Sequence, residues 1–235
     1  MNYRSINNDV DAWVHYPKHR WLFNKLEVSL KLGHDAAPIM VPVTRPGKYI
    51  IRPIYNLYGM GIGAHIKELR PEDPFSDHAM GPPGTFWCEY FEGPHVSVDY
   101  KHSNDQYDPG APTDWVAYNA MQGSYDEKDL VKFLNWTRID VPTHALKVPE
   151  WIPKDLDDLN IEWRGESIIE VHMRLGNDIM HDKHMGTVIT PLWEGDPVPN
   201  DVFHLPNEES GRYDASGYLD RNRVGYTMKK RYPDW

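Results

Sequence analysis

Apolar residues recur at helical spacing near the start of the chain. Leu22, Leu26 and Leu30 lie four positions apart and would share one side of a helix. Gly33 stands where a helix commonly ends, because glycine readily adopts the left-handed conformation found there. The spacing therefore predicts a helix over residues 18–33. Two shorter helices are expected at 64–69 and 126–136.

Other stretches alternate between apolar and polar residues or are apolar throughout, which is typical of strands. Strands are expected at 48–54, 85–91, 95–100, 158–163 and 166–174. Gly93-Pro94 is expected to join the second and third of these, and Arg164-Gly165 to close the last two into a hairpin. Residues 103–125 are expected to form a loop, and residues 191–235 an irregular segment on the surface.

The composition predicts a folded protein with a sizeable core. Of the 235 residues, 40% are hydrophobic and 26% charged, which suits one large domain or two lobes around a cleft. No apolar run approaches the roughly 20 residues of a membrane helix, and the start lacks the features of a signal peptide. We therefore expect a cytoplasmic protein without membrane partners.

The single cysteine, Cys88, excludes internal disulfides, and its apolar neighbours predict a buried thiol rather than a reactive one.

The charge balance restricts the ligands that the protein can attract. The 25 Lys and Arg residues face 35 Asp and Glu, giving a net charge of -10. This excess of acid argues against a nucleic-acid partner or an anionic membrane surface. An anionic ligand would need a local cluster of cations. The sequence does not determine the oligomeric state, and a homo-oligomer is one of the alternatives.

A glycine-rich stretch follows the first predicted strand. Gly59, Gly61 and Gly63 allow positive φ and close backbone approach, so that successive N–H groups can surround phosphate oxygens. The spacing also fits the G-x-G-x-x-A turn of dinucleotide-binding folds. That turn requires an acidic strand end about 20 residues later, whereas Asp77 lies in a proline-rich loop. A tight turn without any ligand is an equally good interpretation.

Three polar residues share one side of the predicted hairpin. Glu170 and His172 are two positions apart and so point from the same face of one strand, and pairing could bring Glu162 beside them. Two carboxylates and an imidazole can hold Mg²⁺ when phosphate oxygens and water complete the shell. The alternative is an exposed polar face without a ligand.

Two further histidines, His181 and His184, are three positions apart, as in some zinc sites on helices. No cysteine or histidine close by completes such a set, so we favour surface histidines. The chain also lacks the G-x-S-x-G sequence of a serine nucleophile.

The order of these segments carries more information than any one of them. A helix containing Lys25 precedes Ile50-Ile51-Arg52-Pro53, the glycine stretch, Glu89-Tyr90-Phe91-Glu92-Gly93, His95-Val-Ser-Val-Asp-Tyr, Ile-Glu-Trp and Ile-Ile-Glu-Val-His-Met-Arg. In this order, about residues 16–178 resemble the ATP-grasp family of nucleotide-dependent carboxylate ligases.

The resemblance implies an α+β fold in which two lobes hold a nucleotide between antiparallel sheets. Residues 1–15 would be an N-terminal segment and 16–86 a small lobe with the phosphate-binding strand and glycine loop. Residues 87–190 would be a large lobe with the hinge and the metal-binding strands, followed by the irregular extension at 191–235. On this resemblance, the domain that usually precedes this fold would be largely missing, and we expect the acceptor pocket to come from 179–235, from 101–125 or from a second chain.

The resemblance also implies roles for individual residues. Arg52 and Lys25, or Arg20 in place of Lys25, would bind phosphates, and Gly59, Gly61 and Gly63 would close over them. Glu89, Tyr90 and Phe91 would form the hinge that reads adenine, and His95 takes the place of a ribose-binding Glu. Glu162, Glu170 and His172 would bind Mg²⁺, and Arg174 would approach the reacting carboxylate or phosphate. Arg52, His95 and His172 depart from the family's usual Lys, Glu and Asn.

The activity implied by the resemblance is an ATP-dependent carboxylate–amine ligase that works with Mg²⁺ through an acyl phosphate. Its substrates would be ATP and an unidentified small carboxylate or amine. The three departures motivate a second hypothesis, a non-catalytic nucleotide-binding or assembly protein. A nicotinamide-dependent oxidoreductase, suggested by the glycine turn, is the third.

Overall fold

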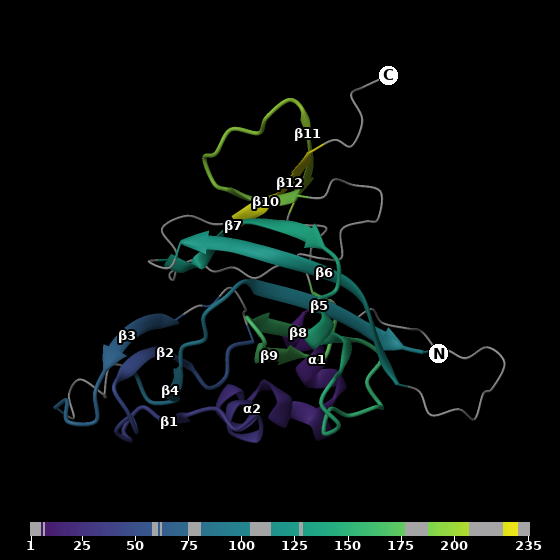
Figure 1. The fold of residues 1–235 in the computed structure, drawn as a ribbon. Coiled ribbons are helices and arrows are strands. Elements are labelled where there is room, and N and C mark those ends of the chain that lie inside the picture. Colours follow the sequence, from purple (N-terminus) through teal and green to yellow (C-terminus); the bar gives the residue numbers. More distant parts are fainter. Residues whose placement is uncertain are drawn as a thin grey trace.

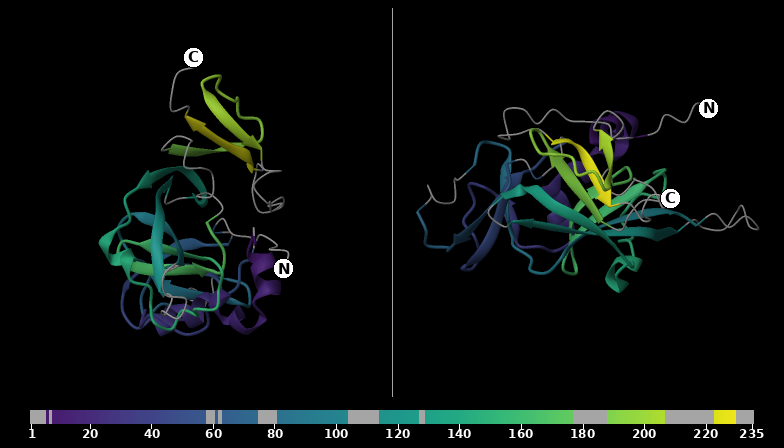
Figure 2. Two further views of the ribbon diagram at one scale, coloured as in Figure 1. Left: turned by 90° about the vertical axis from the view of Figure 1, so that its right-hand side faces the viewer. Right: turned by 90° about the horizontal axis from the view of Figure 1, so that it is seen from above.

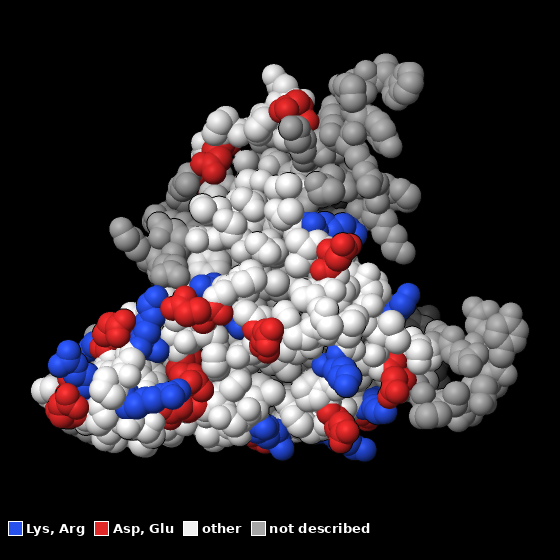
Figure 3. Space-filling view, viewed as in Figure 1, with Lys and Arg blue, Asp and Glu red and all other residues white. Residues whose placement is uncertain are grey.

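The fold is known from a computed structural model that describes residues 6, 8–57, 61, 63–74, 81–103, 114–126, 129–176, 188–206 and 223–229. Its described elements form two antiparallel sheets, with a group of short helices packed beneath them (Figure 1). None of the described helices has the length and hydropathy needed to cross a membrane. Basic and acidic side chains are interspersed over the face drawn in Figure 3.

Three short helical segments open the chain. They are α1 (Asp9–His15), the 3-10 helix η1 (Pro17–Phe23) and α2 (Lys25–Lys31). The single helix predicted over 18–33 is therefore divided at Asn24, whose side chain accepts a hydrogen bond from the backbone N–H of Glu27 and so caps α2. The backbone N–H of Lys25 donates to the carbonyl of Ile54. This bond fixes the start of α2 at the end of a strand that carries Arg52.

The smaller sheet has the strand order β1-β4-β2-β3. Its strands are β1 (Ala36–Pro38), β2 (Gly47–Pro53), β3 (His65–Leu69) and β4 (Thr85–Glu89). Buried Tyr49, Ile51 and Trp87 form its core. The helix expected at 64–69 is wrong, because this segment pairs with β2 as a strand, with Ile50 opposite Ile66.

The larger sheet has the order β11-β12-β10-β7-β6-β5-β8-β9. Its strands are β5 (His95–His102), β6 (Trp115–Asp126), β7 (Asp129–Ile139), β8 (Leu159–Arg164), β9 (Ser167–His172), β10 (Val188–Trp193), β11 (Val202–Pro206) and β12 (Arg223–Lys229). A 3-10 helix, η2 (Thr143–Leu146), lies between β7 and β8. The predicted hairpin of β8 and β9 is confirmed, with Glu162 directly opposite Glu170.

Two expectations fail in the larger sheet. Most of the loop expected at 103–125 that the structure describes is β6, and the helix expected at 126–136 is largely β7. A β-bulge explains the second error: Phe133 is opposite Tyr125 and Asn135 opposite Ser124, so Leu134 is left opposite no residue of β6. The extra residue places Phe133 and Trp136, three positions apart, on one face. This spacing imitates a helical period.

The C-terminal region also differs from expectation. The irregular segment predicted at 191–235 contains β11 and β12, which pair with each other and extend the larger sheet through β10. Figure 2 shows these strands standing away from the rest of the molecule.

The connection between the sheets is a tight crossing rather than a hairpin turn. β4 and β5 belong to different sheets, and Gly93 lies between them with a φ of 106°. A Cβ on Gly93 would lie 2.8 Å from the Cα of Gly165 in the turn after β8. The boundary predicted between residues 86 and 87 falls inside β4, so the change of sheet comes later, near Gly93.

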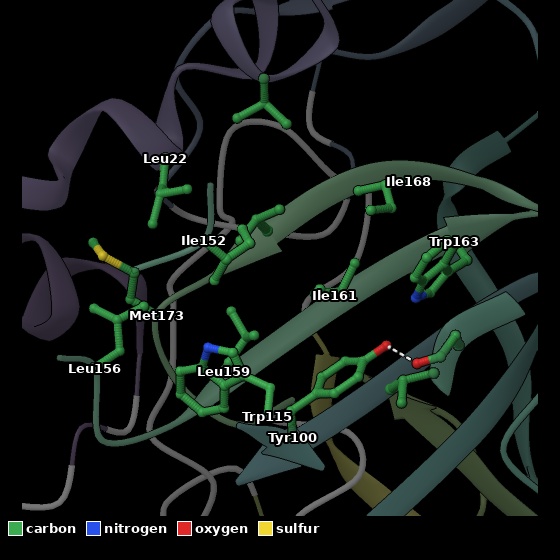
Figure 4. Close-up of a cluster of buried hydrophobic side chains, with 14 of the residues drawn as sticks. Leu22, Tyr100, Trp115, Ile152, Leu156, Leu159, Ile161, Trp163, Ile168 and Met173 are labelled. Atoms are coloured by element: carbon green, nitrogen blue, oxygen red, sulfur yellow. Dashed lines mark hydrogen bonds between the residues drawn. The ribbon is translucent and has the colours of Figure 1, made fainter. Parts of the chain in front are cut away.

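The main core lies between the N-terminal helices and the larger sheet (Figure 4). Leu22, Leu159 and Ile161 are at most 1% exposed there. The buried hydroxyl of Tyr100 donates to the carbonyl of Ala145 over 2.8 Å. One face of the β5–β8–β9 region is thus anchored in apolar packing, which leaves the opposite face for polar side chains.

Candidate functional site

A cleft between the two sheets collects most of the predicted site residues. The empty space in and around this cleft, open solvent at its mouth included, is about 1410 Å³. The smaller sheet and the crossing segment contribute one wall, and the larger sheet the other. The predicted residues that line it are Lys25, Arg52, Gly61, Glu89, Tyr90, Phe91, His95, Glu162, Glu170, His172 and Arg174.

Two cations meet one carboxylate across this cleft. Lys25 Nζ lies 2.5 Å from Glu170 Oε1, and Arg52 Nη1 lies 3.1 Å from the same oxygen. Arg52 Nη2 also donates to the carbonyl of Ile169, a residue that a bulge in β9 leaves opposite no residue of β8. Burial alone would raise the pKa of Glu170, but the charges of Lys25 and Arg52 lower it below its usual value. Arg52 and Glu170 therefore face each other, each as the other's counter-ion.

The alternative cation, Arg20, lies elsewhere. Its Nε donates to the carbonyl of Trp13, and its guanidinium lies over the ring of the same residue. Of the two candidates, Lys25 is the one that lines the cleft.

Glu162, Glu170 and His172 come together on neighbouring strands. One ligand atom from each lies within 4.8 Å of the others. His172 Nε2 is 3.5 Å from Glu162 Oε1 and 3.5 Å from Glu170 Oε2, and among the described residues it has no hydrogen-bond partner. Burial would raise the pKa of Glu162, but the imidazoles of His172 and His95 beside it hold that pKa well below its usual range. Two carboxylates and a nitrogen directed at one point form a donor set that fits a divalent cation.

Sequence reasoning missed Asp9, which is 1% exposed and contacts His172 on the side of the ring away from Glu162 and Glu170. Its Oδ1 lies 3.1 Å from His172 Nδ1. Arg174 binds both oxygens of the same carboxylate, from Nε to Oδ1 over 2.7 Å and from Nη2 to Oδ2 over 2.9 Å. Burial would raise the pKa of Asp9, but the charges of Arg174 and His172 hold it below its usual range. Conversely, burial would lower the pKa of His172, yet the Asp9 charge raises it to about 9.

Arg174 therefore has a partner other than the predicted one. Its fork holds Asp9, and its Nη1 donates to the carbonyl of Leu175. Arg174 still lines the cleft, and its role at the reacting group stays a prediction.

The hinge residues line the cleft, but several of their polar atoms already have partners. Glu89 accepts a hydrogen bond from the backbone N–H of Asp35 and pairs with Arg45 over 2.5 Å. Arg164 donates to the hydroxyl of Tyr90 and to the carbonyl of Phe91. An adenine that used the Glu89 carboxylate would have to compete with Arg45. The role predicted for this segment stays a prediction.

His95 stands at the meeting point of the carboxylates and an aromatic wall. Its Nε2 lies 3.0 Å from Glu162 Oε2. Its ring centroid is 5.3 Å from that of Phe133, 5.5 Å from Trp136 and 6.0 Å from Tyr125. The ribose contact proposed for His95 remains a prediction, and the aromatic wall was missed because β6 and β7 were not recognised as strands.

Gly61 of the glycine stretch lies close to β7. Gly61 has a φ of 62°, and a Cβ there would lie 3.1 Å from the carbonyl oxygen of Leu130. Gly63 has a φ of 78°, whereas Gly59 lies outside the described residues. The segment after the loop is β3, which pairs antiparallel with β2. The nicotinamide hypothesis is wrong on this point, since a dinucleotide turn would lead into a helix after a parallel strand.

Three candidates remain, Cys88, His181 and His184, and Cys88 is one of the residues that line the cleft. Cys88 is 1% exposed, and burial raises the pKa of its thiol, so the expectation of a buried cysteine is confirmed. His181 and His184 lie outside the described residues.

No protein-family model matches the sequence, and no curated protein matches it. The fold, however, is similar to that of N5-carboxyaminoimidazole synthetase from Staphylococcus aureus solved with ADP. The TM-score is 0.53 at 11% identity, over 92% of this chain and 69% of that one. The chain has an ATP-grasp fold.

Two further solved structures are similar to this chain at lower TM-scores. An L-amino acid ligase from Bacillus licheniformis gives a TM-score of 0.48 at 7% identity, over 95% of this chain and 66% of that one. Carboxyaminoimidazole ribonucleotide synthase from Aspergillus clavatus, solved with ATP, gives 0.43 at 10% identity, over 97% and 69%. The expected α+β fold with two antiparallel sheets is confirmed.

Proposed function

We propose that this chain is an ATP-dependent ligase that joins a carboxylate to an amine, or to a similar nucleophile, through an acyl phosphate. The observation that carries the proposal is that Lys25 and Arg52 face a cluster of metal-type ligands across one cleft of an ATP-grasp fold. The N5-carboxyaminoimidazole synthetase that shares this fold was solved with ADP.

The phosphates of ATP would replace the carboxylate of Glu170 as the partner of two cations. Lys25 and Arg52 have side chains only 11% and 6% exposed, and both pair with the single carboxylate of Glu170. Leaving a buried cation unpaired is costly, so an anion that enters must replace Glu170 as their partner. Triphosphate oxygens suit this exchange, because an Arg fork and a Lys point charge both bind phosphate well. Glu170 would then be released toward Glu162 and His172.

The set formed by Glu162, Glu170 and His172 would hold Mg²⁺ or a similar ion. When bound, such an ion neutralises charge on the phosphate oxygens and orients them for transfer. Gly61, which lines the cleft beside Leu130 of β7, would approach the phosphates from that side.

The chemistry itself would be a transfer in two steps. A substrate carboxylate oxygen attacks the γ-phosphorus, the bond to the β–γ bridging oxygen breaks, and ADP leaves. The amine nitrogen then attacks the carbonyl carbon of the acyl phosphate, inorganic phosphate leaves, and the nitrogen loses a proton to solvent. Lys25 and Arg52 would stabilise the charge on the transferring group, and the protein would act by positioning and electrostatics, without a side-chain nucleophile.

The test is binding and turnover of ATP. We expect ATP with a divalent ion to bind by calorimetry, and mass spectrometry to find ADP and a condensation product against pooled amino acids and carboxylates. Lys25→Gln should weaken ATP binding by about tenfold or more, given the worth of a charge-assisted contact. Lys154→Gln is the matched control, because Lys154 also pairs with a carboxylate but on the exposed surface. Equal ATP affinity in the two variants would contradict the assignment.

The bonds that occupy Arg174 favour a second candidate, a non-catalytic nucleotide-binding or assembly protein with the same fold. Here the guanidinium would stay with Asp9 as a structural pair. Tight ATP binding without any product over hours would support this candidate over the ligase.

A further inference from the structure

The cleft carries a positive charge that contrasts with the charge of the whole chain. The described residues that line it include five Lys and Arg but three Glu, whereas the chain has a net charge of -10. Lys25, Arg52 and Arg174 pair with carboxylates around the predicted metal site, and Arg164 donates to the hinge. The fifth cation, Arg223, lies on β12, outside residues 16–178 that resemble the ATP-grasp family.

A β-bulge directs the side chain of Arg223 toward the aromatic part of the sheet. In the pairing of β12 with β10, Val224 is opposite no residue, since the register shifts between Leu192 and Trp193. Residues three positions apart point to opposite faces of a regular strand, but the bulge allows Arg223 and Tyr226 to share one face. The guanidinium carbon of Arg223 lies 4.6 Å from the centre of the Tyr226 ring.

The ring of Tyr226 connects Arg223 with the aromatic wall of the cleft. Tyr226 is 1% exposed and packs in one cluster with Trp136 and Phe133. The rings of Phe133 and Trp136 are stacked, with centroids 4.5 Å apart. A cation over the face of an aromatic ring is attracted to it without using a hydrogen-bond donor. Arg223 is thus held beside a flat apolar surface with its charge directed at the cleft that it lines.

Arg223 stands apart from the cations of the proposed phosphate site. Five strands of the larger sheet separate β12 from β9, which carries Glu170, the partner of Lys25 and Arg52. Neighbouring strands lie about 4.8 Å apart, so Arg223 belongs to another part of the wall. Gly61 nevertheless lines the cleft together with Arg223. The two parts therefore open into one space, as a ligase with a second substrate requires.

We propose that Arg223 and the aromatic wall bind the acceptor substrate, which carries a carboxylate or phosphate group apart from its reacting atom, together with a ring or other apolar body. The inference deepens the proposed function and rests on it, because only a ligase needs an acceptor. An Arg fork matches the oxygens of carboxylate and phosphate. Phe133 and Trp136 offer a surface on which the apolar body packs.

The experiment titrates three probes into the nucleotide-free, full-length protein, followed by ligand-observed nuclear magnetic resonance. Phenylacetate and phenyl phosphate carry the two anionic groups, and phenylacetamide has a ring without a charge. We expect both anions to bind at least about tenfold more tightly than phenylacetamide, given the strength of a charge-assisted hydrogen bond.

Variants assign this binding to residues. Arg223→Gln should weaken both anions about tenfold and leave phenylacetamide unchanged. Phe133→Leu should weaken all three probes by a similar factor, about threefold. Arg20→Gln is the matched control, because Arg20 also lies over an aromatic ring, that of Trp13, but is not among the described residues that line the cleft.

Three outcomes would overturn the inference. They are equal binding of the anions and phenylacetamide, anion binding that Arg223→Gln leaves unchanged, and absence of anion binding at millimolar concentration. The first comparison uses the unaltered chain, so it stands even if a variant folds poorly.

ATP binding separates this inference from the proposed function. Lys25→Gln should weaken ATP but not the probes, and Arg223→Gln should weaken the anionic probes but not ATP. Loss of ATP affinity in Arg223→Gln, or of probe affinity in Lys25→Gln, would overturn the inference, because the two sites would then be one. Failure of ATP to bind to the unaltered protein would overturn the proposed function and leave the Arg223-dependent probe binding as measured.

Discussion

The contact between Gly93 and Gly165 offers a direct test of how the two sheets are joined. Gly165 has a φ of 58°, and a Cβ there would lie 2.5 Å from the carbonyl oxygen of Glu92. An alanine at 165 would therefore face two costs. The left-handed backbone costs about 1–2 kcal/mol for a residue with a side chain, and overpacking against a fixed backbone atom costs about 1–3 kcal/mol. We expect Gly165→Ala to lower the free energy of unfolding by about 3 kcal/mol.

Gly33 provides the matched control, because its φ is 76° and a Cβ added there would meet no atom of the described residues within 4 Å. Gly33→Ala should carry the backbone cost alone, about 1 kcal/mol. Urea unfolding followed by tryptophan fluorescence measures both values, and the difference corresponds to roughly 4–8 °C in Tm for a domain of this size. Equal losses in the two variants would refute the reasoning, since they would mean that the Glu92–Gly165 approach relaxes without cost.

Three further perturbations test other parts of the molecule. Glu170→Gln leaves two buried cations without their shared carboxylate, so the free energy of unfolding in urea should fall by about 3 kcal/mol; an unchanged value would contradict the pairing. Burial raises the pKa of Asp99 from 3.8 to about 6, so the folded chain holds this proton more tightly than the unfolded chain. The free energy of unfolding should therefore fall by about 2 kcal/mol as the pH rises from 4 to 6, and by about 3 kcal/mol in all between about pH 3 and pH 7. Asp99→Asn should remove that decline. If the free energies of unfolding of the unaltered protein and of this variant changed with pH in parallel, Asp99 would not be the cause. Leu159→Ala in the core should cost about 2–5 kcal/mol, whereas Leu134→Ala, at a side chain 55% exposed, should change stability by less than about 0.5 kcal/mol.

The sequence predicts best where local signals determine the structure. The β8–β9 hairpin follows from short apolar runs around Arg164-Gly165, and strand pairing then brings Glu162 opposite Glu170 as expected. The strand that carries Arg52 is likewise predicted, since it is short, apolar and followed by glycines. These features depend on neighbours within a few residues, which is the range that hydrophobic patterns describe.

Prediction fails where distant pairing decides the structure. The segment 126–136 has apolar residues at helical spacing, but a bulge at Leu134 allows the same spacing to serve a strand paired with β6. Phe133 and Trp136 of the cleft were missed for this reason, and Tyr125 was missed because β6 was expected to be a loop. Asp9 gives no local signal either, because its partners His172 and Arg174 are 163 and 165 positions further along the chain.

That separation has a consequence for how the protein reaches its native state. The pocket cannot be completed until synthesis has passed Arg174, so the first helical turn must remain hydrated while most of the polypeptide emerges from the ribosome. Closing a loop of this length comes late and slows folding, as it does for other proteins rich in non-local contacts. A nascent chain halted before β9 would leave the carboxylate of Asp9 without His172 and Arg174, and the cleft would be among the last parts of the protein to form.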